Sequence, residues 1–249
     1  MTHQQKRLTK REKRLSRQNS PAVSENTPNL GLNLNNIVPL TDNQRVAYEG
    51  YEDGDNLMMH GIAGTGKSFL GVYFALREIL SGISNKRKLI IVRSVVPTRD
   101  MGFLPGNSAE KAAVYEAPYV AICTELFGRG DAYELLKRKG VIEFISTSFI
   151  RGVTLNDGIV LVDEMQNCSF HELDTVMTRI GKNTRIMFSG DFRQSDFTKE
   201  QERSGLREFM RVVKGMRSFN FIDFQKEDIV RSALVKEYII KKDELRISL

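Results

Sequence analysis

The segment "MMHGIAGTGKSFLG", residues 58–71, decides the fold class of this chain of 249 residues. An apolar run comes first, Gly61 then stands five positions before Gly66, and Lys67 and Ser68 follow directly. A GxxxxGK[ST] loop between a strand and a helix is a specific phosphate-binding signal, because glycines let backbone N–H groups turn toward a phosphate. The alternative is a tight strand-to-helix turn without a ligand. The segment therefore predicts a site for a nucleoside triphosphate.

The side chains of this loop predict how the triphosphate is held. Lys67 reaches the β and γ phosphates, and the hydroxyl of Ser68 is a ligand for Mg²⁺. The predicted nucleotide-binding residues of the loop are Gly61, Ile62, Ala63, Gly64, Thr65, Gly66, Lys67, Ser68 and Phe69.

Composition predicts a soluble, cytoplasmic protein without a membrane partner. With 41% hydrophobic residues, the chain can bury a core as one large domain or at most two small ones. No apolar stretch approaches the ~18 residues of a membrane span, and the basic N-terminus lacks the apolar region of a signal peptide. Cys123 and Cys168 lie far apart, which excludes a disulfide framework or a zinc site. Any metal should therefore have oxygen ligands.

Basic residues gather at the N-terminus. The first 20 residues contain seven Lys and Arg against one acidic residue, Glu12, and so account for the whole net charge of +6. Such a tail can attract phosphate backbones without reading their sequence; the alternative is a solubilising tail. We expect residues 1–30 to be a basic, disordered tail when unbound, and residues 31–249 to form one domain.

From residue 37 onward, short apolar runs alternate with amphipathic segments. This pattern is typical of an α/β fold with a mostly parallel sheet and helices on both faces. The predicted strands are 57–60, 89–94, 141–146, 159–163, 185–189 and 219–224. Helices are predicted after a capping box of Thr41 and Gln44, and over 68–81, 108–127, 131–139 and 227–245, with further helical segments in the gaps.

The segment "GIVLVDEMQN", residues 158–167, predicts the metal-binding part of the site. Its apolar strand carries Asp163 to the C-terminal end, where open α/β sheets place ligands. Asp163 can hold Mg²⁺, mostly through water, and Glu164 is placed to polarise an attacking water. The alternative is a pair of acids at the start of a helix. A phosphate loop about ninety residues upstream favours the first interpretation.

A third segment, "RIMFSGDFRQSDF" at residues 185–197, ends another predicted strand in polar residues. Gln194 lies just beyond that strand and can contact the γ phosphate or orient water, a contact that is lost on hydrolysis. The alternative is an exposed loop glutamine.

Together, GIAGTGKS, VDEMQN and SGDFRQSD resemble motifs I, II and III of superfamily 1 helicases. The resemblance to the PhoH family is closer and covers most of residues 40–240 in the family's order. It rests on RDMGFLPGNSAEK (99–111), RGVTLNDGIVLVDEMQN (151–167), TRIG (178–181), SGL (204–206) and EDIVRSALV (227–235). This resemblance implies a single RecA-like P-loop domain with an extra strand between the two Walker strands, and ATP and Mg²⁺ as cofactors.

The chain departs from the family pattern at a few positions. It has Arg93-Ser94 where the family has an Arg-Pro pair, "AVYEAPYV" where it has a proline-tyrosine segment, and Met165 where it has Ala. None of these is a phosphate ligand. The first two lie where a nucleic-acid contact would be expected.

The resemblance also implies roles for residues outside the segments that resemble motifs I, II and III. Gln44 would bind the adenine edge, as a helicase Q motif does, or else cap its own helix. Arg231 in "EDIVRS" would supply positive charge to a phosphate as an arginine finger, or else be a surface arginine. Arg99 and Arg151 are candidate contacts to a nucleic-acid backbone, with structural salt bridges as the alternative.

The resemblance implies a Mg²⁺-dependent ATPase that couples hydrolysis to binding or unwinding single-stranded RNA or DNA. Lys67, Glu164, Gln194 and Arg231 would be the catalytic residues. Because only about 55 residues follow Gln194, too few for a second such core, the other half of each site would come from another copy in a closed homo-oligomer such as a hexameric ring. The alternative function is a nucleotide-dependent regulatory or stress-response switch without helicase activity. A small-molecule kinase is disfavoured, since Glu164 beside Asp163 suits water activation.

Overall fold

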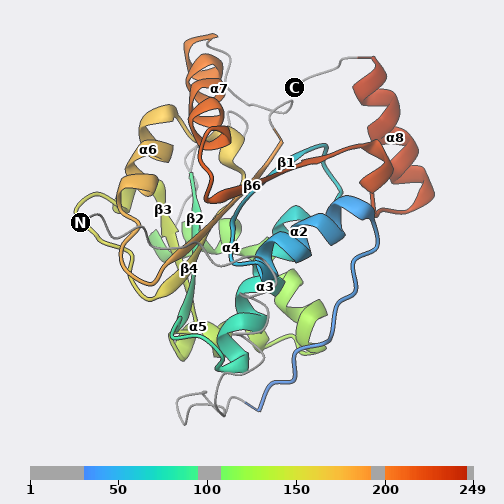
Figure 1. Cartoon of the computed structure of the whole chain (residues 1–249). Coiled ribbons are helices and arrows are strands. Elements are labelled where there is room, and N and C mark those ends of the chain that lie inside the picture. The colour runs from blue at the N-terminus through green and yellow to red at the C-terminus, as the bar shows by residue number, and fades with distance from the viewer. Residues whose placement is uncertain (1–30, 95–107, 192–199, 246–249) are drawn as a thin grey trace, which may run out of the picture.

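A parallel β-sheet forms the centre of the molecule (Figure 1). A computed structural model describes residues 31–94, 108–191 and 200–245. Within these residues the sheet has six strands in the order β3-β2-β4-β5-β1-β6, and all the pairs are parallel. The strands are β1 (Asn56–Gly61), β2 (Lys88–Arg93), β3 (Ile142–Ser146), β4 (Gly158–Val162), β5 (Arg185–Gly190) and β6 (Phe219–Phe224). Each predicted strand is confirmed to within one residue at either end.

The strand order agrees with the RecA-like arrangement that the resemblance implies. β1 leads into the phosphate loop, β4 leads to Asp163, and β5 lies between them, paired with both. The predicted extra strand between the two Walker strands is therefore β5.

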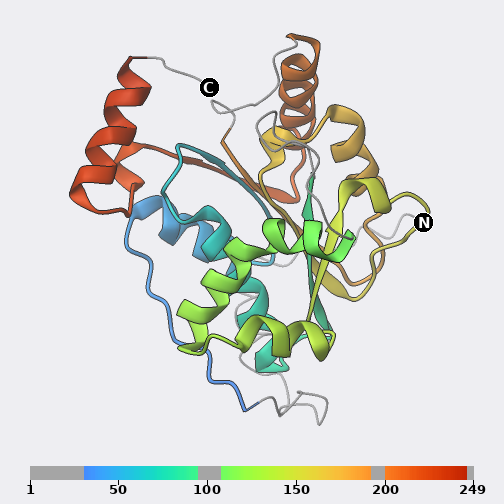
Figure 2. The same ribbon diagram turned by 180° about the vertical axis from the view of Figure 1, so that it is seen from behind.

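Helices cover both faces of the sheet. Side chains alternate along each strand, so the sheet has an apolar face on either side that the helices bury. Leu57 and Met59 of β1 join one apolar cluster with α2–α5, whereas Met58 joins a second cluster with α6 and α7. Figures 1 and 2 show these two layers from opposite sides. The helices are α2 (Asp42–Glu52), α3 (Lys67–Ser81), α4 (Ser108–Phe127), α5 (Ala132–Arg138), α6 (Phe170–Thr178), α7 (Glu200–Lys214) and α8 (Ala233–Glu244).

The C-terminal helix begins later than predicted. The sequence pattern predicts a helix over 227–245, but a short 3-10 turn at Lys226–Asp228 and an extended stretch come before α8. The carboxylate of Asp228 accepts a hydrogen bond from the backbone N–H of Gln225, and the N–H of Val230 donates to Gly64 O at 3.0 Å. A tertiary hydrogen bond to the phosphate loop therefore replaces the first turn of the predicted helix.

No helix within residues 31–94, 108–191 and 200–245 has the length and apolar character needed to cross a bilayer.

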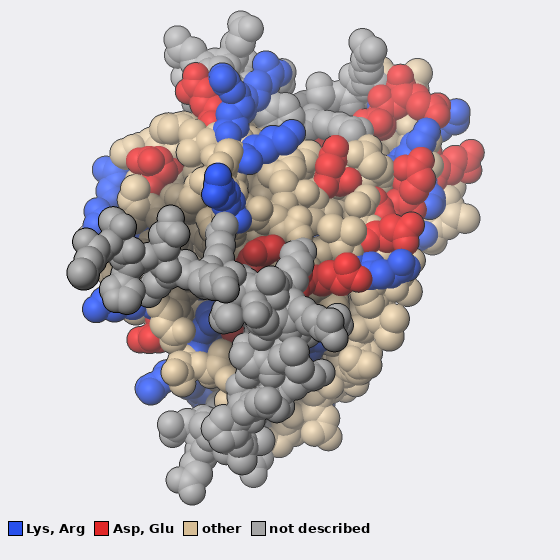
Figure 3. All heavy atoms as spheres, in the orientation of Figure 1, with Lys and Arg blue, Asp and Glu red and all other residues tan. Residues whose placement is uncertain are grey.

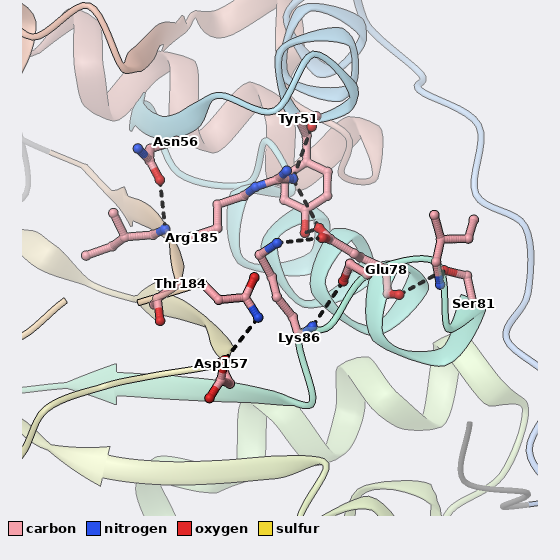
Figure 4. Close-up of polar contacts among 12 residues, drawn as sticks. Tyr51, Asn56, Glu78, Ser81, Lys86, Asp157, Thr184 and Arg185 are labelled. Carbon is pink, nitrogen blue, oxygen red and sulfur yellow. Dashed lines mark hydrogen bonds and ion pairs between the residues drawn. The ribbon is translucent and has the colours of Figure 1, made fainter. Parts of the chain in front are cut away.

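A half-buried ionic cluster joins α2, α3 and β5 at the end of the sheet opposite the phosphate loop (Figure 4). The carboxylate of Glu78 accepts a hydrogen bond from Tyr51 Oη at 2.6 Å and pairs with Arg185 and Lys86, each at 3.1 Å. The Arg185 guanidinium also lies over the Tyr51 ring, 4.2 Å from its centroid. Burial raises the pKa of Glu78, but Arg185, Tyr51 and Lys86 together outweigh it, so that the pKa lies below its ordinary value of 4.5.

We expect Glu78→Gln to destabilise the fold, because it leaves the largely buried Arg185 without its carboxylate. The expected loss is about 3 kcal/mol in the free energy of unfolding at neutral pH, measured by urea titration. Because the folded-state pKa of Glu78 is depressed, its contribution is present above 4.5 and is lost as the pH falls through the lowered value. The difference between variant and wild type should therefore shrink in acid.

The matched control is Glu143→Gln, which breaks the more exposed pair with Lys88 and should cost no more than ~1 kcal/mol. Equal losses in the two variants would contradict the role assigned to Glu78.

Candidate nucleotide site

The phosphate loop lies between β1 and α3, as predicted. Gly61, Gly64 and Gly66 have φ values of +124°, +80° and +83°, in the region that favours glycine. At Gly61 a side chain is also excluded sterically, because an added Cβ would lie 2.1 Å from the carbonyl oxygen of Phe224. Gly66 stands at the N-cap of α3 and has no side chain to cap the first-turn N–H groups. The loop therefore directs the positive end of a helix toward its ligand.

Lys67 is held inside this loop. Its side chain is buried, and Nζ donates hydrogen bonds to the carbonyl oxygens of Gly61 and Ile62, both at 2.8 Å, and to Thr65 Oγ1 at 3.2 Å. Burial lowers the pKa of Lys67, against the opposing effect of nearby Asp191, Glu164 and Asp163. The three loop oxygens thus engage all three N–H donors of the ammonium group, and a phosphate contact would replace one of them.

Ser68 and Asp163 meet between α3 and the end of β4, which fits a Mg²⁺ site. Ser68 Oγ donates to Asp163 Oδ1 at 2.7 Å and lies 3.5 Å from Ser189 Oγ. The oxygen donors of Ser68 and Asp163 thus lie side by side next to the phosphate loop. Mg²⁺ is usually bound by one or two carboxylates together with substrate phosphates, so this pair suits the ion.

Glu164 follows Asp163 in a left-handed backbone conformation, with φ +51° and ψ +43°. A non-glycine residue in this region is uncommon and costs on the order of 1–3 kcal/mol, and such residues gather at functional sites. Burial and the adjacent Asp163 raise the pKa of the Glu164 carboxyl, with Arg93, Gln166 and Lys67 opposing the shift. A carboxylate in this setting suits the general-base role that the sequence predicts.

Gln166 connects Glu164 with the end of β5. Its amide Nε2 donates to the Glu164 carboxylate, and its Oε1 accepts a hydrogen bond from the backbone N–H of Asp191 at 3.0 Å. Gln166 is buried, and the sequence analysis did not single it out although it lies two positions after Glu164. Gln194, predicted to contact the γ phosphate, lies outside the described residues.

Gln44 lies against the phosphate loop. Its Nε2 donates to the Thr65 carbonyl oxygen at 3.0 Å, and its Oε1 accepts from the N–H of Leu40 at 2.8 Å. Half of the predicted capping box is present, since Thr41 Oγ1 accepts from the N–H of Gln44 at 3.3 Å. The Gln44 side chain thus connects the start of α2 with the loop, and its role toward adenine stays a prediction.

The segment before α8 covers the outer side of the loop. An added Cβ at Gly64 would lie 3.1 Å from Arg231 Cγ and 3.2 Å from Ile239 Cδ1. Arg231 is exposed, so the structure places this predicted arginine beside the phosphate loop of its own chain. Whether it contacts a phosphate stays a prediction.

Tyr119 is a further residue that the sequence analysis missed. It is fully buried on α4, and its hydroxyl donates to Asp163 Oδ2 at 2.8 Å. No local pattern points to it, because it lies 44 positions from Asp163 and the two meet only through helix packing.

The fold and this site define the chain as a P-loop NTPase domain: the glycine-rich loop, its lysine and the β4 aspartate meet at the carboxyl edge of a parallel sheet. The chain belongs to the PhoH family, whose model, described as "PhoH-like protein", matches residues 36–242.

Comparison with a curated relative agrees with this assignment. The PhoH-like protein of Bacillus subtilis (strain 168) is 32% identical over 205 residues, which are 82% of this chain and 63% of the relative. The chain thus spans less than two thirds of that relative's length. Among solved structures, the large terminase of a thermophilic bacteriophage aligns with a TM-score of 0.46 and 11% identity, over 81% of this chain and 50% of the terminase. The Pif1 helicase from Candida albicans aligns with a TM-score of 0.41 and 16% identity, over 84% and 44% of the two chains.

Gln44→Ala separates loop support from adenine recognition. Because both ends of the Gln44 amide are engaged by Leu40 and Thr65, we expect the variant to weaken ATP and GTP binding alike, by about tenfold, through a less ordered loop. Equilibrium binding of the two fluorescently labelled nucleotides measures this. A loss confined to ATP would show instead that Gln44 reads the adenine base. Arg45→Ala, one position later on α2, is the control, because Arg45 is exposed and pairs with Asp42 of the same helix.

Proposed function

We propose that this protein is a Mg²⁺-dependent ATPase that couples hydrolysis to binding or unwinding single-stranded RNA or DNA. The observation that carries the proposal is the meeting of Lys67, Ser68, Asp163 and Glu164 at one edge of the sheet. A protein that only binds the nucleotide needs Lys67, Ser68 and Asp163. A half-buried carboxylate beside them, that of Glu164, with a raised pKa, is what water activation adds.

In the proposed reaction, Glu164 accepts a proton from a water molecule as the water oxygen bonds to the γ phosphorus of ATP. The bond from that phosphorus to the β–γ bridging oxygen breaks, and ADP and inorganic phosphate are the products. Mg²⁺, held by Ser68 and Asp163, would neutralise charge on the phosphates. Lys67 adds a positive charge to the same phosphates, and Gln166 keeps the Glu164 carboxylate in place.

Basic side chains on α7 support a nucleic-acid partner. Arg207, Arg211 and Lys214 are exposed and lie on one face of the helix, while Leu206 and Phe209 of the same helix are buried. Figure 3 shows Lys and Arg gathered over α7. Such a stripe suits contacts to a phosphate backbone. We propose that the tail at residues 1–30 adds to this attraction.

The loop after β3 offers a second contact of the same kind. Arg151 is exposed there, with its guanidinium 2.9 Å from His171 Nε2, and Phe149 is 76% exposed. An exposed aromatic ring next to an arginine suits stacking and backbone contacts with a single strand. Arg99, the other predicted contact, lies outside the described residues.

The proposal is tested by the ATPase rate with and without single-stranded RNA and DNA. We expect either polynucleotide to raise the rate, and Glu164→Gln to lower it at least about a hundredfold while ATP still binds. The assay is repeated without residues 1–30 and at two salt concentrations, since the basic tail alone gives salt-sensitive binding. Hydrolysis that no polynucleotide changes would favour a nucleotide-dependent switch, and no hydrolysis at all would contradict the proposal.

The exposed face of α8 supports a homo-oligomer, with a hexameric ring as one form. None of the residues of α8, all of which the structure describes, is buried. Leu234 and Tyr238, together with Leu245 just past the helix end, are 77%, 68% and 69% exposed. They share one helix face, and α8 follows directly on the segment that contacts Gly64. We propose that a second copy covers this face and so lies next to the nucleotide site.

We expect the double variant Leu234→Glu, Tyr238→Glu to sediment as a monomer under conditions where the wild type forms oligomers. The added charges would be buried without partners in the interface. Ile83→Glu is the control. Ile83 is equally exposed, but it follows α3 at the end of the sheet opposite the phosphate loop. A wild type that remains monomeric with ATP and nucleic acid present would contradict the oligomer.

A further inference from the structure

Tyr119 holds the side of Asp163 that faces away from Ser68. Within the described residues, Asp163 Oδ2 accepts a hydrogen bond from Tyr119 Oη at 2.8 Å, while Oδ1 accepts one from Ser68 Oγ at 2.7 Å. The two donors come from different helices, α4 and α3. The carboxylate of Asp163 is thus clamped in one rotational position.

The Tyr119 side chain lies in the interior of the protein. The side chain has no exposed surface, and its ring lies 6.1 Å from that of Phe144 on β3. The buried ring thus holds the hydroxyl in place beside Asp163 Oδ2.

We propose that Tyr119 is a positioning residue of the magnesium site: it fixes Asp163 with Oδ1 toward Ser68, and these two side chains would hold Mg²⁺. The inference rests on the proposed function, because the Mg²⁺ site at Ser68 and Asp163 is part of it. Removing a group that hydrogen-bonds to a metal-binding side chain and orients it typically lowers metal affinity by about tenfold to a hundredfold. Tyr119 is such a group here.

The position of Tyr119 is itself set by the packing of α4 on α5. Glu116, one turn earlier on α4, accepts hydrogen bonds from Tyr133 Oη and Lys137 Nζ of α5, both at 2.6 Å. A displacement of α4 would therefore move the Tyr119 hydroxyl away from Asp163. The bond from Lys137 remains when the Tyr133 hydroxyl is removed, so we expect α4 to keep its place in Tyr133→Phe. The metal site thus depends on the position of a helix that supplies no predicted metal or phosphate ligand.

This packing also supplies a matched control. Tyr133→Phe removes one buried tyrosine hydroxyl from the same pair of helices without touching Asp163. Tyr119→Phe removes the other, and keeps the ring that packs against Phe144.

The test measures metal binding directly. Mn²⁺ replaces Mg²⁺ and is titrated by electron paramagnetic resonance in the presence of ADP. We expect Tyr119→Phe to weaken Mn²⁺ binding about tenfold or more, and to raise the Mg²⁺ concentration for half-maximal ATPase to match. Tyr133→Phe should leave both unchanged. Binding of ADP in EDTA should be the same in all three proteins, and melting temperatures report the folding of each variant.

Wild-type Mn²⁺ affinity in Tyr119→Phe would overturn the inference, and so would equal weakening in Tyr133→Phe. If Tyr119→Phe does not fold, Tyr119→Leu takes its place with the same expectation. Asp163→Asn separates the two proposals. If the wild type binds Mn²⁺ more tightly than Asp163→Asn but hydrolyses no ATP, the ATPase proposal fails and the inference is still decided by Mn²⁺ binding. If the two bind alike, Asp163 is no metal ligand and the inference fails, while the ATPase proposal is still decided by hydrolysis.

Discussion

The hydrogen bond from Ser68 to Asp163 joins two residues that lie 95 positions apart in the chain. It forms because β1 and β4 run parallel in the sheet, with β5 paired between them. In the sheet, Phe188 of β5 pairs with Met58 on one side and with Val162 on the other. A shift of β5 by one residue relative to either neighbour would separate the phosphate loop from its acidic partner. The rest of the site depends on this register.

Gathering charge at this edge is costly, and the structure offsets the cost locally. Lys67, Asp163 and Asp191 are all buried, and the negative charges of the carboxylates oppose the effect of burial on the Lys67 ammonium group. Glu164 adds a left-handed backbone conformation. The ionic cluster around Glu78 lies at the opposite edge, where it joins α2, α3 and β5 without involving these residues. The candidate nucleotide site and the ionic cluster around Glu78 thus lie at opposite ends of the sheet's strands.

The phosphate loop is held by segments from both ends of the described chain. Gln44, at the start of α2, supports it through Thr65, and Val230, before α8, supports it through Gly64. Side chains next to Gly64 come from Arg231 and Ile239 of the C-terminal segment. A change in the loop on nucleotide binding therefore has a direct physical route to α8 and its exposed apolar face.

The sequence by itself determined the six strands, the phosphate loop and the pair Asp163 and Glu164. Each of these depends on local chemistry: glycine at positive φ, a lysine and serine at a helix start, and apolar runs that end in acids. The resemblance to the PhoH family added the expectation of an extra strand between the Walker strands. These features were predictable because neighbours in the chain decide them.

Only the tertiary structure decided where α8 begins, what the Gln44 side chain contacts and which residue stands behind Asp163. Val230 gives its N–H to Gly64 instead of to a helix, and Tyr119 reaches Asp163 from a helix that carries no motif. Such contacts join segments that are distant in the chain, and they exist only once strand order and helix packing have brought those segments together. Local patterns carry no information about that meeting, because a hydrogen bond depends on distance in space and not on separation along the chain.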